Sequence, residues 1–332
     1  MMTIIFYSVI FALIATLSHK FLTGDGDFTL LLKGKVKRES FQDKVVWITG
    51  ASRGIGEVLA KQLATLGAKI IISARNEAEL ERVKKHISAL GKHGPEGVEI
   101  LPLDLSSGED AIGDAVEKAV SLFGGAGVDY MIHNAAFERP KSTALDVPEA
   151  SLKATLDVNV MGPISLTRLL LPHMLKRGRG HFVVMSSAAG KAPAPGQAVY
   201  SASKFALNGY FHSLRSEYAT ELHQKIGKSS RRRHRHRQKV ELTLYQKGIM
   251  VTVVCPGPIE TSNAPDTSTS GQRGVREKRV SSERCAELTL VAASHGLKEA
   301  WISFQIGAKR VETAAQKGNT YSMNLLFGRK KE

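Results

Sequence analysis

Tyr200, Lys204 and Ser187 are the residues of this sequence whose types and spacing could do chemistry. A free phenol has a pKa of about 10 and is a poor acid or base at neutral pH. A cation one helical turn away favours the phenolate and lowers that pKa toward the working range. A serine hydroxyl nearby could then hold a substrate carbonyl or hydroxyl in line with the phenol. The alternative is a surface helix on which Tyr and Lys simply share a face.

Two elements must position these side chains. The apolar run from Phe182 to Met185 is typical of a buried strand, because small and turn-forming residues follow it at once. From about Val199 the pattern becomes helical, and residues four apart lie on one face of a helix. Ligands of parallel α/β sheets bind at the carboxyl ends of the strands. The serines that end the strand and the Tyr–Lys pair are therefore expected to converge there.

A glycine-rich turn lies early in the globular sequence. Residues 44–49 are typical of a buried strand, residues 50–56 read Gly-Ala-Ser-Arg-Gly-Ile-Gly, and a helical pattern continues to Leu66. Glycines let the backbone approach a pyrophosphate, and a helix amino terminus supplies N–H groups and a positive dipole. Strand, turn and helix together predict a dinucleotide site. The residues of this turn expected to bind the cofactor are Gly50, Ser52, Arg53, Gly54, Ile55 and Gly56.

The next strand, residues 69–73, indicates which dinucleotide binds. Sites selective for NAD usually place an acidic residue here, whereas this chain has Arg75, together with Arg53 in the glycine turn. Two guanidiniums suit a 2′-phosphate, so we predict NADP(H) as the cofactor. The alternative is that Arg75 is a solvated residue at a helix start. Asp104, which ends a strand over residues 98–103, is expected to accept a hydrogen bond from the adenine amino group.

The rest of the pattern continues the alternation of strands and helices. A strand over residues 128–132 leads into Asn134, and a long amphipathic helix is predicted over 149–176. Pro163 is expected to bend this helix or to loosen its hydrogen bonds near Asn159. Asn159 itself could be a functional residue or a buried amide whose hydrogen bonds are satisfied within the protein. The sequence therefore predicts a single α/β domain with a Rossmann-type, doubly wound parallel sheet. The two cysteines lie far apart without metal-ligand spacing, so no metal is expected.

The first residues of the chain form an apolar segment. No side chain from Met1 to His19 carries a full charge, and a helix over residues 1–22 would reach about 30 Å, enough to span a bilayer core. A cleaved signal peptide would need a basic start and a small-x-small cleavage site, neither of which is evident; a buried soluble helix is the other alternative. We expect a membrane anchor over 1–22 and a basic linker over 23–40, with the globular part in the cytosol.

These motifs, in this order, resemble those of the short-chain dehydrogenase/reductase (SDR) family over residues 41–301. The resemblance implies that Tyr200 is the catalytic acid/base, that Lys204 tunes it and holds the nicotinamide ribose, and that Ser187 positions the reacting oxygen. It implies that Asn159 anchors a water in the proton relay. The motifs that carry the resemblance are Thr49–Gly56, Asn134–Ala136, Asn159, Ser187, Tyr200 with Lys204, and Pro256–Ile259.

Three more positions match the family's cofactor site. Asn134 falls in the stretch that steadies the central strand, and Ile259 and Thr261 fall in the stretch that faces the nicotinamide end. The family's Asn-Asn-Ala-Gly reads His-Asn-Ala-Ala over residues 133–136, where the extra methyl of Ala136 would hinder close approach of the backbone.

Within the family, the apolar start and residues 201–206 and 283–287 are similar to the dehydrogenase/reductase member 7 subgroup, and to its plant forms especially. That subgroup is similar to the hydroxysteroid dehydrogenases. The similarity implies lipophilic carbonyl or alcohol substrates, such as steroids or retinoids.

A strongly basic segment follows the helix of Tyr200, which is expected to end near Leu222. Residues 223–247 carry nine Lys or Arg and one Glu, a local net charge of +8 out of +15 for the chain. Such a run could bind nucleic acid, anionic lipid or an import receptor. Because no Phe, Tyr or Trp is interleaved in the most basic part of this segment, residues 231–237, to stack bases, we expect a disordered, solvated insertion and no nucleic-acid partner.

The Rossmann domain is expected to cover residues 41–305, with a tail over 306–332. A polar stretch over 262–282 is expected to form a mobile lid over the substrate. We predict an NADP(H)-dependent oxidoreductase that transfers a hydride reversibly between nicotinamide and a carbonyl or secondary alcohol of a small lipophilic substrate.

The expected location is a membrane, that of the endoplasmic reticulum, with a homodimer left open. The alternative function is a cofactor-binding but weakly active or inactive relative that acts through its basic insertion on membranes or nucleic acid.

Overall fold

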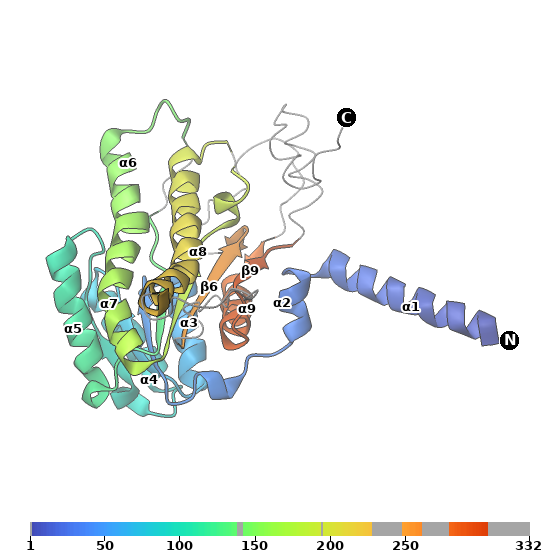
Figure 1. Cartoon of the computed structure of the whole chain (residues 1–332), viewed down its shortest axis with the longest axis horizontal. Helices are drawn as coiled ribbons and strands as arrows, with labels where there is room; N and C mark the ends of the chain where they lie inside the picture. Colours follow the sequence, from blue (N-terminus) through green and yellow to red (C-terminus); the bar gives the residue numbers. More distant parts are fainter. Residues whose placement is uncertain (1, 138–141, 194, 228–247, 261–278, 305–332) are drawn as a thin grey trace.

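The structure is a computed structural model that describes residues 2–137, 142–193, 195–227, 248–260 and 279–304 (Figure 1). Most of the predicted basic insertion, Thr261 with most of the predicted lid, and the predicted tail lie outside the described residues.

Seven strands of the described chain form one parallel sheet in the order β3-β2-β1-β4-β5-β6-β9. The strand order reverses between β1 and β4, the kind of point at which doubly wound sheets bind ligands. All residues of β1 and β5 are buried, because both faces of the sheet are covered. The strands are β1 (Val45–Thr49), β2 (Lys69–Ser73), β3 (Val98–Ile100), β4 (Tyr130–His133), β5 (Gly180–Met185), β6 (Ile249–Pro256) and β9 (Glu299–Ile302).

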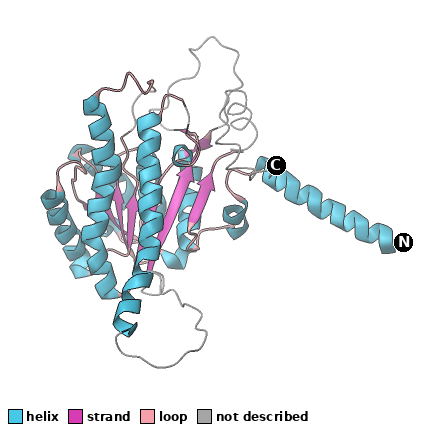
Figure 2. Ribbon diagram, turned by 45° about the horizontal axis from the view of Figure 1, so that its top comes forward, coloured by secondary structure: helices cyan, strands magenta, loops and turns pink. Residues whose placement is uncertain are grey.

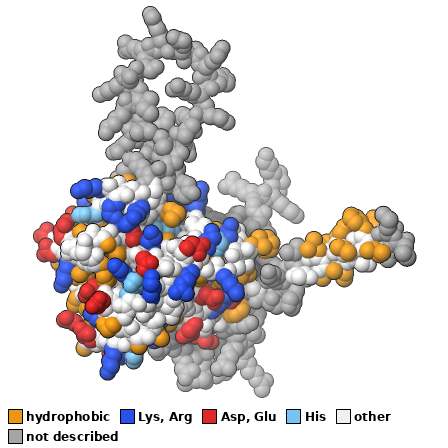
Figure 3. Space-filling model, turned by 90° about the horizontal axis from the view of Figure 1, so that it is seen from below, with side chains coloured by type: hydrophobic (Ala, Val, Ile, Leu, Met, Phe, Trp, Pro, Cys, Tyr) orange, Lys and Arg blue, Asp and Glu red, His pale blue; other side chains and the backbone are white. Residues whose placement is uncertain are grey.

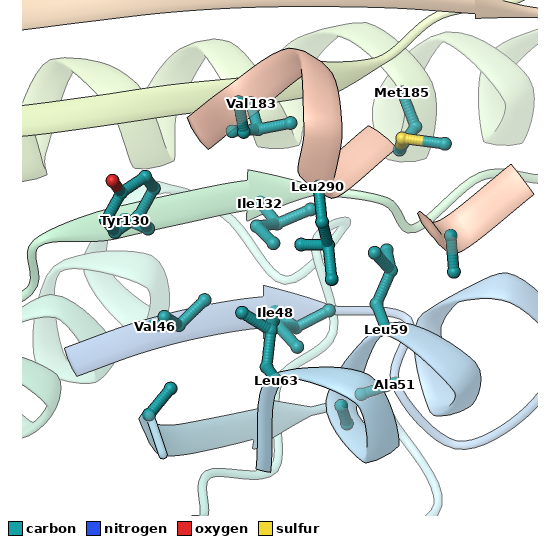
Figure 4. Packing of buried hydrophobic residues seen from close by; sticks show 14 of the residues in the cluster. Val46, Ile48, Ala51, Leu59, Leu63, Tyr130, Ile132, Val183, Met185 and Leu290 are labelled. Atoms are coloured by element: carbon teal, nitrogen blue, oxygen red, sulfur yellow. The ribbon is translucent and has the colours of Figure 1, made fainter. Parts of the chain in front are cut away.

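Helices cover both faces of this sheet (Figure 2). Successive residues of a strand point to opposite faces, so Val46 and Ile48 pack into one core and Val45 and Trp47 into the other. Figure 4 shows the first core, in which Leu59, Leu63 and Leu290 of the helices meet the strands. The first core is covered by α3 (Gly54–Thr65), α4 (Glu77–Ser88) and α9 (Ser282–Ser294), and the second by α5 (Glu109–Gly125), α7 (Gly162–Arg177) and α8 (Ala198–Gly227).

The predicted doubly wound α/β fold is therefore confirmed. The amino-terminal helix α1 (Met2–Thr23) precedes the domain, and short elements complete the connections. The short elements are α2 (Phe28–Lys33), α6 (Glu149–Leu156), η1 (Arg38–Ser40), η2 (Gly94–Gly97), η4 (Ala188–Gly190) and the two-stranded pair of β7 (Ile259–Glu260) and β8 (Val280–Ser281).

The long helix predicted over residues 149–176 is interrupted near Pro163. A π-helical segment, η3 (Asp157–Met161), separates α6 from α7, and Pro163 lies in the first turn of α7. Proline has no N–H and its ring crowds the preceding turn, so it disfavours the regular ladder of hydrogen bonds. A wider turn takes its place, in which the Gly162 N–H donates to the Asp157 carbonyl five residues back. The expected loosening at Asn159 is thus present.

Residues 24–40, expected to be a linker, pack against the body of the protein, and we call them the N-terminal strap. The Asp27 N–H donates to the Trp301 carbonyl of β9 at 2.9 Å, and the Trp301 N–H donates to an Asp27 carboxylate oxygen at 2.7 Å. Asp25 forms a two-fold ion pair with Arg284 of α9, at 2.7 and 3.1 Å. These contacts join the start of the chain to the last strand and helix.

The observed bounds of two helices, α1 and α8, can be compared with the predicted anchor and insertion. α1 forms over the segment predicted as an anchor and projects away from the domain (Figure 1). Among the helices that the structure describes, none is long and apolar enough to cross a membrane. α8 extends to Gly227, beyond its expected end near Leu222, so the first residues of the predicted insertion continue the helix.

Two histidines are buried in the sheet. Nε2 of His133, on β4, lies 2.8 Å from the Thr167 hydroxyl, and Nε2 of His181, on β5, lies 2.8 Å from the Thr252 hydroxyl. Burial lowers the pKa of each ring from 6.5 to about 3. Both rings are therefore neutral at physiological pH, whereas in the unfolded chain they take up a proton as the pH falls below the ordinary value.

The folded state should lose stability as the pH falls from 6.5 toward 3, because only the unfolded chain binds the extra protons. Protonation of each ring in the unfolded chain should lower the free energy of unfolding by about 2 kcal/mol at pH 5. Urea unfolding at pH 7.5 and pH 5 would measure this, with His181→Gln expected to reduce the difference between the two values by about that amount. His86→Gln, at an exposed position of α4, is the control; equal differences for wild type and His181→Gln would contradict the prediction.

Candidate active site

The turn between β1 and α3 can be built only from glycine at three points. A Cβ on Gly50, whose φ is +67°, would lie 2.7 Å from the Ala135 Cα, and one on Gly56 would lie 2.2 Å from the Gly50 carbonyl oxygen. Gly54 has a φ of +57° and open space where a Cβ would project. The turn is thus packed tightly on one side and open at the amino terminus of α3, where backbone N–H groups favour an anion.

Asn134 ties the end of β4 to this turn. Its Nδ2 donates to the carbonyls of Thr49 and Gly50 at 3.0 and 3.1 Å. The Thr49 hydroxyl in turn accepts from the N–H groups of Asn134 and Ala135 at 3.2 and 3.3 Å. These bonds hold the ends of two neighbouring strands together at the point where the strand order reverses. Ala136, where the sequence raises a steric question, is exposed.

Two arginines and one carboxylate lie at the ends of β1, β2 and β3. Arg53 and Arg75 are both exposed. Oδ1 of Asp104 accepts from the Ser106 N–H at 2.9 Å and from the Ser106 hydroxyl at 2.7 Å. Burial opposes ionisation of Asp104, but these hydrogen bonds and the nearby charge of Arg75 outweigh it and lower the pKa of this carboxyl. The group is thus an anion near the exposed guanidinium of Arg75.

Lys204 is almost completely buried, with 2% of its surface exposed. Its Nζ donates to the carbonyl of Met185, the last residue of β5, at 2.8 Å. The same Nζ lies 5.6 Å from the centre of the Tyr200 ring, one turn earlier in α8. The spacing of four residues thus places the ammonium and the phenol on one face of α8, at the carboxyl end of β5, as the sequence predicts.

Ser187 follows β5 and caps the short helix η4. Its Oγ accepts from the Ala189 N–H at 3.1 Å, and the side chain is half-buried. η4 is fastened to α8, because Asn208 Nδ2 donates to the Gly190 carbonyl at 2.9 Å. The adjacent Ser186 is buried. Ser187 is therefore the more accessible of the two serines and lies on an element fixed to the helix of Tyr200.

Asn159 is fully buried in η3, and its side chain is occupied by protein groups. Oδ1 accepts from the Phe137 N–H at 2.6 Å, and Nδ2 donates to the Phe137 carbonyl at 3.0 Å and to the Ser203 hydroxyl at 3.2 Å. Ser203 donates to the Tyr200 carbonyl at 2.7 Å. Asn159 thus connects the segment after β4 to the helix of Tyr200.

The structure brings most of the predicted site residues to one edge of the sheet. Ile259 is half-buried in β7, which pairs with β8, a strand within the last residues of the predicted lid. Sequence reasoning gave no role to Thr49 or Ser203, although both lie within motifs that it singled out, because a hydroxyl that bridges backbone groups has no signature of its own. Thr261 lies outside the described residues.

Neither cysteine is poised to act as a nucleophile. Burial raises the pKa of the Cys255 thiol to about 12, and it does the same for Cys285. Both thiols are therefore protonated at physiological pH. In the part of the chain that the structure covers, no group of three or more His, Cys, Asp or Glu could hold a metal ion.

Known proteins are similar to this chain in sequence. The family described as short chain dehydrogenase matches residues 44–222. Dehydrogenase/reductase SDR family member 7 of Homo sapiens is 34% identical over 295 residues, which cover 86% of this chain and 78% of the human protein. 11-beta-hydroxysteroid dehydrogenase A of Sesamum indicum is 33% identical over 195 residues, 59% of this chain and 54% of that protein.

A solved structure agrees with these matches. The crystal structure of a metagenomic short-chain oxidoreductase in complex with NADP has a TM-score of 0.57 and 27% identity, and it covers 77% of this chain and 92% of its own. The chain belongs to the short-chain dehydrogenase family. This membership confirms the predicted family and the predicted class of enzyme, a dehydrogenase or reductase that acts on CH–OH groups.

Proposed function

We propose that this protein is an NADP(H)-dependent oxidoreductase that interconverts a carbonyl and a secondary alcohol on a small lipophilic substrate. The observation that carries the proposal is the burial of Lys204 at the Met185 carbonyl, 5.6 Å from the ring of Tyr200. A buried ammonium is costly unless it is paired or used. Here its charge favours the phenolate of Tyr200, one turn earlier on the same face of α8.

The roles of the side chains follow from this arrangement. Tyr200 donates its phenolic proton to the substrate oxygen during reduction and takes it back during oxidation. Lys204 stabilises the phenolate between these two events. Ser187 holds the substrate oxygen by a hydrogen bond. Asn159 supports the proton relay through its backbone and through the segment that its amide holds.

The residues present fit a dinucleotide phosphate cofactor. The open side of Gly54 and the amino terminus of α3 suit a pyrophosphate, and the exposed pair Arg53 and Arg75 suits a 2′-phosphate. When bound, NADPH would supply the hydride from its nicotinamide ring. The complex of a similar oxidoreductase with NADP supports this choice.

The other proposed contacts lie around this cofactor. The residues proposed to border it are Gly50, Ser52, Ile55, Gly56, Asp104, Asn134, Tyr200, Lys204 and Ile259, with Thr261 remaining a prediction outside the described residues.

The substrate class rests on similarity and on the amino-terminal helix. A relative named as a hydroxysteroid dehydrogenase supports a steroid or a comparable lipophilic molecule. α1 presents apolar side chains outside the domain (Figure 3), which supports attachment to a membrane such as that of the endoplasmic reticulum. The homodimer stays a prediction. Seven apolar side chains of α1 are each at least 55% exposed: Ile5, Phe6, Tyr7, Val9, Phe11, Leu13 and Ile14.

Tyr200→Phe should lower kcat by about a hundredfold or more, because it removes the transferable proton while leaving the ring in place. Consumption of NADPH with a panel of lipophilic ketones and aldehydes measures the rate, and the pH profile of the variant should lack one ionisation. Tyr210→Phe, on the same helix, is the matched control. An unchanged kcat for Tyr200→Phe would refute the role. If the wild type consumed no NADPH with any member of the panel, the inactive, cofactor-binding alternative would replace this proposal.

Arg75→Asp should exchange the cofactor preference, because a carboxylate repels the 2′-phosphate and accepts from ribose hydroxyls. Wild type should bind NADPH at least about tenfold more tightly than NADH, and the variant should lose or reverse that ratio. Titration calorimetry with both cofactors gives the dissociation constants. Arg168→Asp, at an exposed site on α7, is the control. Equal affinity of the wild type for NADPH and NADH is the result that contradicts this prediction.

Removal of residues 1–23 should release the protein from membranes, because the exposed apolar surface of α1 is lost. The measurement is the fraction that stays in the membrane pellet after alkaline carbonate extraction, compared with the full chain. The shortened protein should retain NADPH binding, since the N-terminal strap remains. Recovery of the full chain in the supernatant would contradict membrane attachment.

A further inference from the structure

Arg82, on α4, makes hydrogen bonds to three groups: Ser52 in the glycine turn, Glu57 in the helix that follows it, and Glu79 on α4 itself. Its two terminal nitrogens donate to the two carboxylate oxygens of Glu57 at 3.1 and 2.9 Å. Nη2 also donates to the Ser52 carbonyl at 3.0 Å, and Nε donates to Glu79 at 2.9 Å. A planar guanidinium can satisfy such a set because its donors form a rigid fork.

Glu57 gives this fork its anchor on α3. It lies in the first turn of that helix, and its side chain is 13% exposed. Hydrogen bonds from Arg82 and Lys61 lower the pKa of Glu57 to about 2 despite its burial, so it is ionised at physiological pH. A lone carboxylate at this helix end would repel a phosphate. Pairing with two cations offsets its charge and leaves it as a fixed point for Arg82.

The contact with Ser52 acts on the backbone of the turn itself. The carbonyl and the following N–H of a trans peptide point in opposite directions, and the described residues contain no cis peptide. Fixing the Ser52 carbonyl on Arg82 therefore also fixes the direction of the Arg53 N–H. Two residues later the turn is open at Gly54, where nothing lies within 4 Å of a Cβ position. The turn is thus held by Arg82 at Ser52 and is open at Gly54.

We propose that Arg82, anchored by Glu57, is a positioning residue that holds the glycine turn in the conformation that binds the cofactor pyrophosphate. The inference rests on the proposed NADP(H) function and deepens it. Without Arg82, the Ser52 carbonyl would lose the one described hydrogen bond that joins the backbone of the turn to a side chain of α4. Cofactor binding would then have to order the turn, at a cost in affinity. The chemistry of the hydride and proton transfers would be unaffected once the cofactor is bound.

The test compares Arg82→Met, Glu57→Gln and the control Arg168→Met in the full chain. The control breaks another arginine–glutamate pair between helices, that of Arg168 with Glu109, far from the turn in the sequence. Arg82→Met should raise the Kd for NADPH by about tenfold while kcat at saturating NADPH stays within about twofold of wild type. Arg82→Lys should raise the Kd by less than Arg82→Met, because the ammonium can still pair with Glu57. It should not restore the wild-type Kd, because an ammonium cannot donate to both Glu57 and the Ser52 carbonyl in the same geometry.

Glu57→Gln separates positioning from simple charge attraction. If Arg82 acted only as a positive charge near the phosphates, removing the negative charge of Glu57 would tighten NADPH binding. If Arg82 positions the turn, Glu57→Gln loosens its anchor and weakens binding. A Kd for Glu57→Gln at or below that of wild type would therefore overturn the proposal.

Amide hydrogen exchange without cofactor makes the result independent of the proposed function. Peptides that cover residues 50–58 should exchange faster in Arg82→Met than in wild type, and at the wild-type rate in Arg168→Met. Unchanged exchange in Arg82→Met would overturn the positioning role. Failure of the wild type to bind NADPH would instead overturn the proposed function, while the exchange comparison would still decide whether Arg82 holds the turn.

Discussion

The arrangement of the site depends on one buried ammonium. An ammonium removed from water loses several kcal/mol of hydration unless protein groups replace it. For Lys204 the described replacements are the carbonyl that ends β5 and the electron-rich face of the Tyr200 ring. This requirement sets the distance between β5 and α8, because the carbonyl and the helix must both stay within reach of one side chain. A second bond between the two elements runs from Asn208 of α8 to the Gly190 carbonyl of η4, which follows β5.

A continuous set of hydrogen bonds connects the glycine turn to the helix of Tyr200. Asn134 holds the Gly50 carbonyl, and three residues later the backbone of Phe137 is held by Asn159. Asn159 reaches Ser203, which donates to the Tyr200 carbonyl. Each step is a bond of 2.6 to 3.2 Å between buried or half-buried groups. The position of the phenol relative to the turn is therefore set by short local contacts and not by the sheet alone.

The sequence predicted those parts of the fold whose signals are local. The strand predicted over residues 69–73 is observed at those residues. Its apolar run favours a buried strand, and the helix cap that follows at Asn76 limits how far the strand can extend. Pro163 likewise predicted the loosened helix near Asn159, because a missing N–H acts within one turn. The pairing of Tyr200 with Lys204 follows from helical spacing.

Contacts between distant parts of the chain could not be predicted in this way. Asp25 and Asp27 fall within the predicted basic linker, and their partners on α9 and β9 lie more than 250 residues away in the chain. Arg82 reads as an ordinary solvated residue of an amphipathic helix until the fold brings Ser52 beside it. Asn159 was assigned to a proton relay by resemblance, but only the packing shows that its amide is occupied by Phe137 and Ser203.

The N-terminal strap also bears on how the molecule behaves among copies of itself. β9 is the outermost strand at its end of the described sheet, and an outer strand offers unpaired N–H and carbonyl groups to any other extended chain. Asp27 occupies both backbone groups of Trp301, in the middle of that edge. The strap therefore blocks the register in which a second polypeptide could continue the sheet, and it protects the border of the domain from self-association by strand addition.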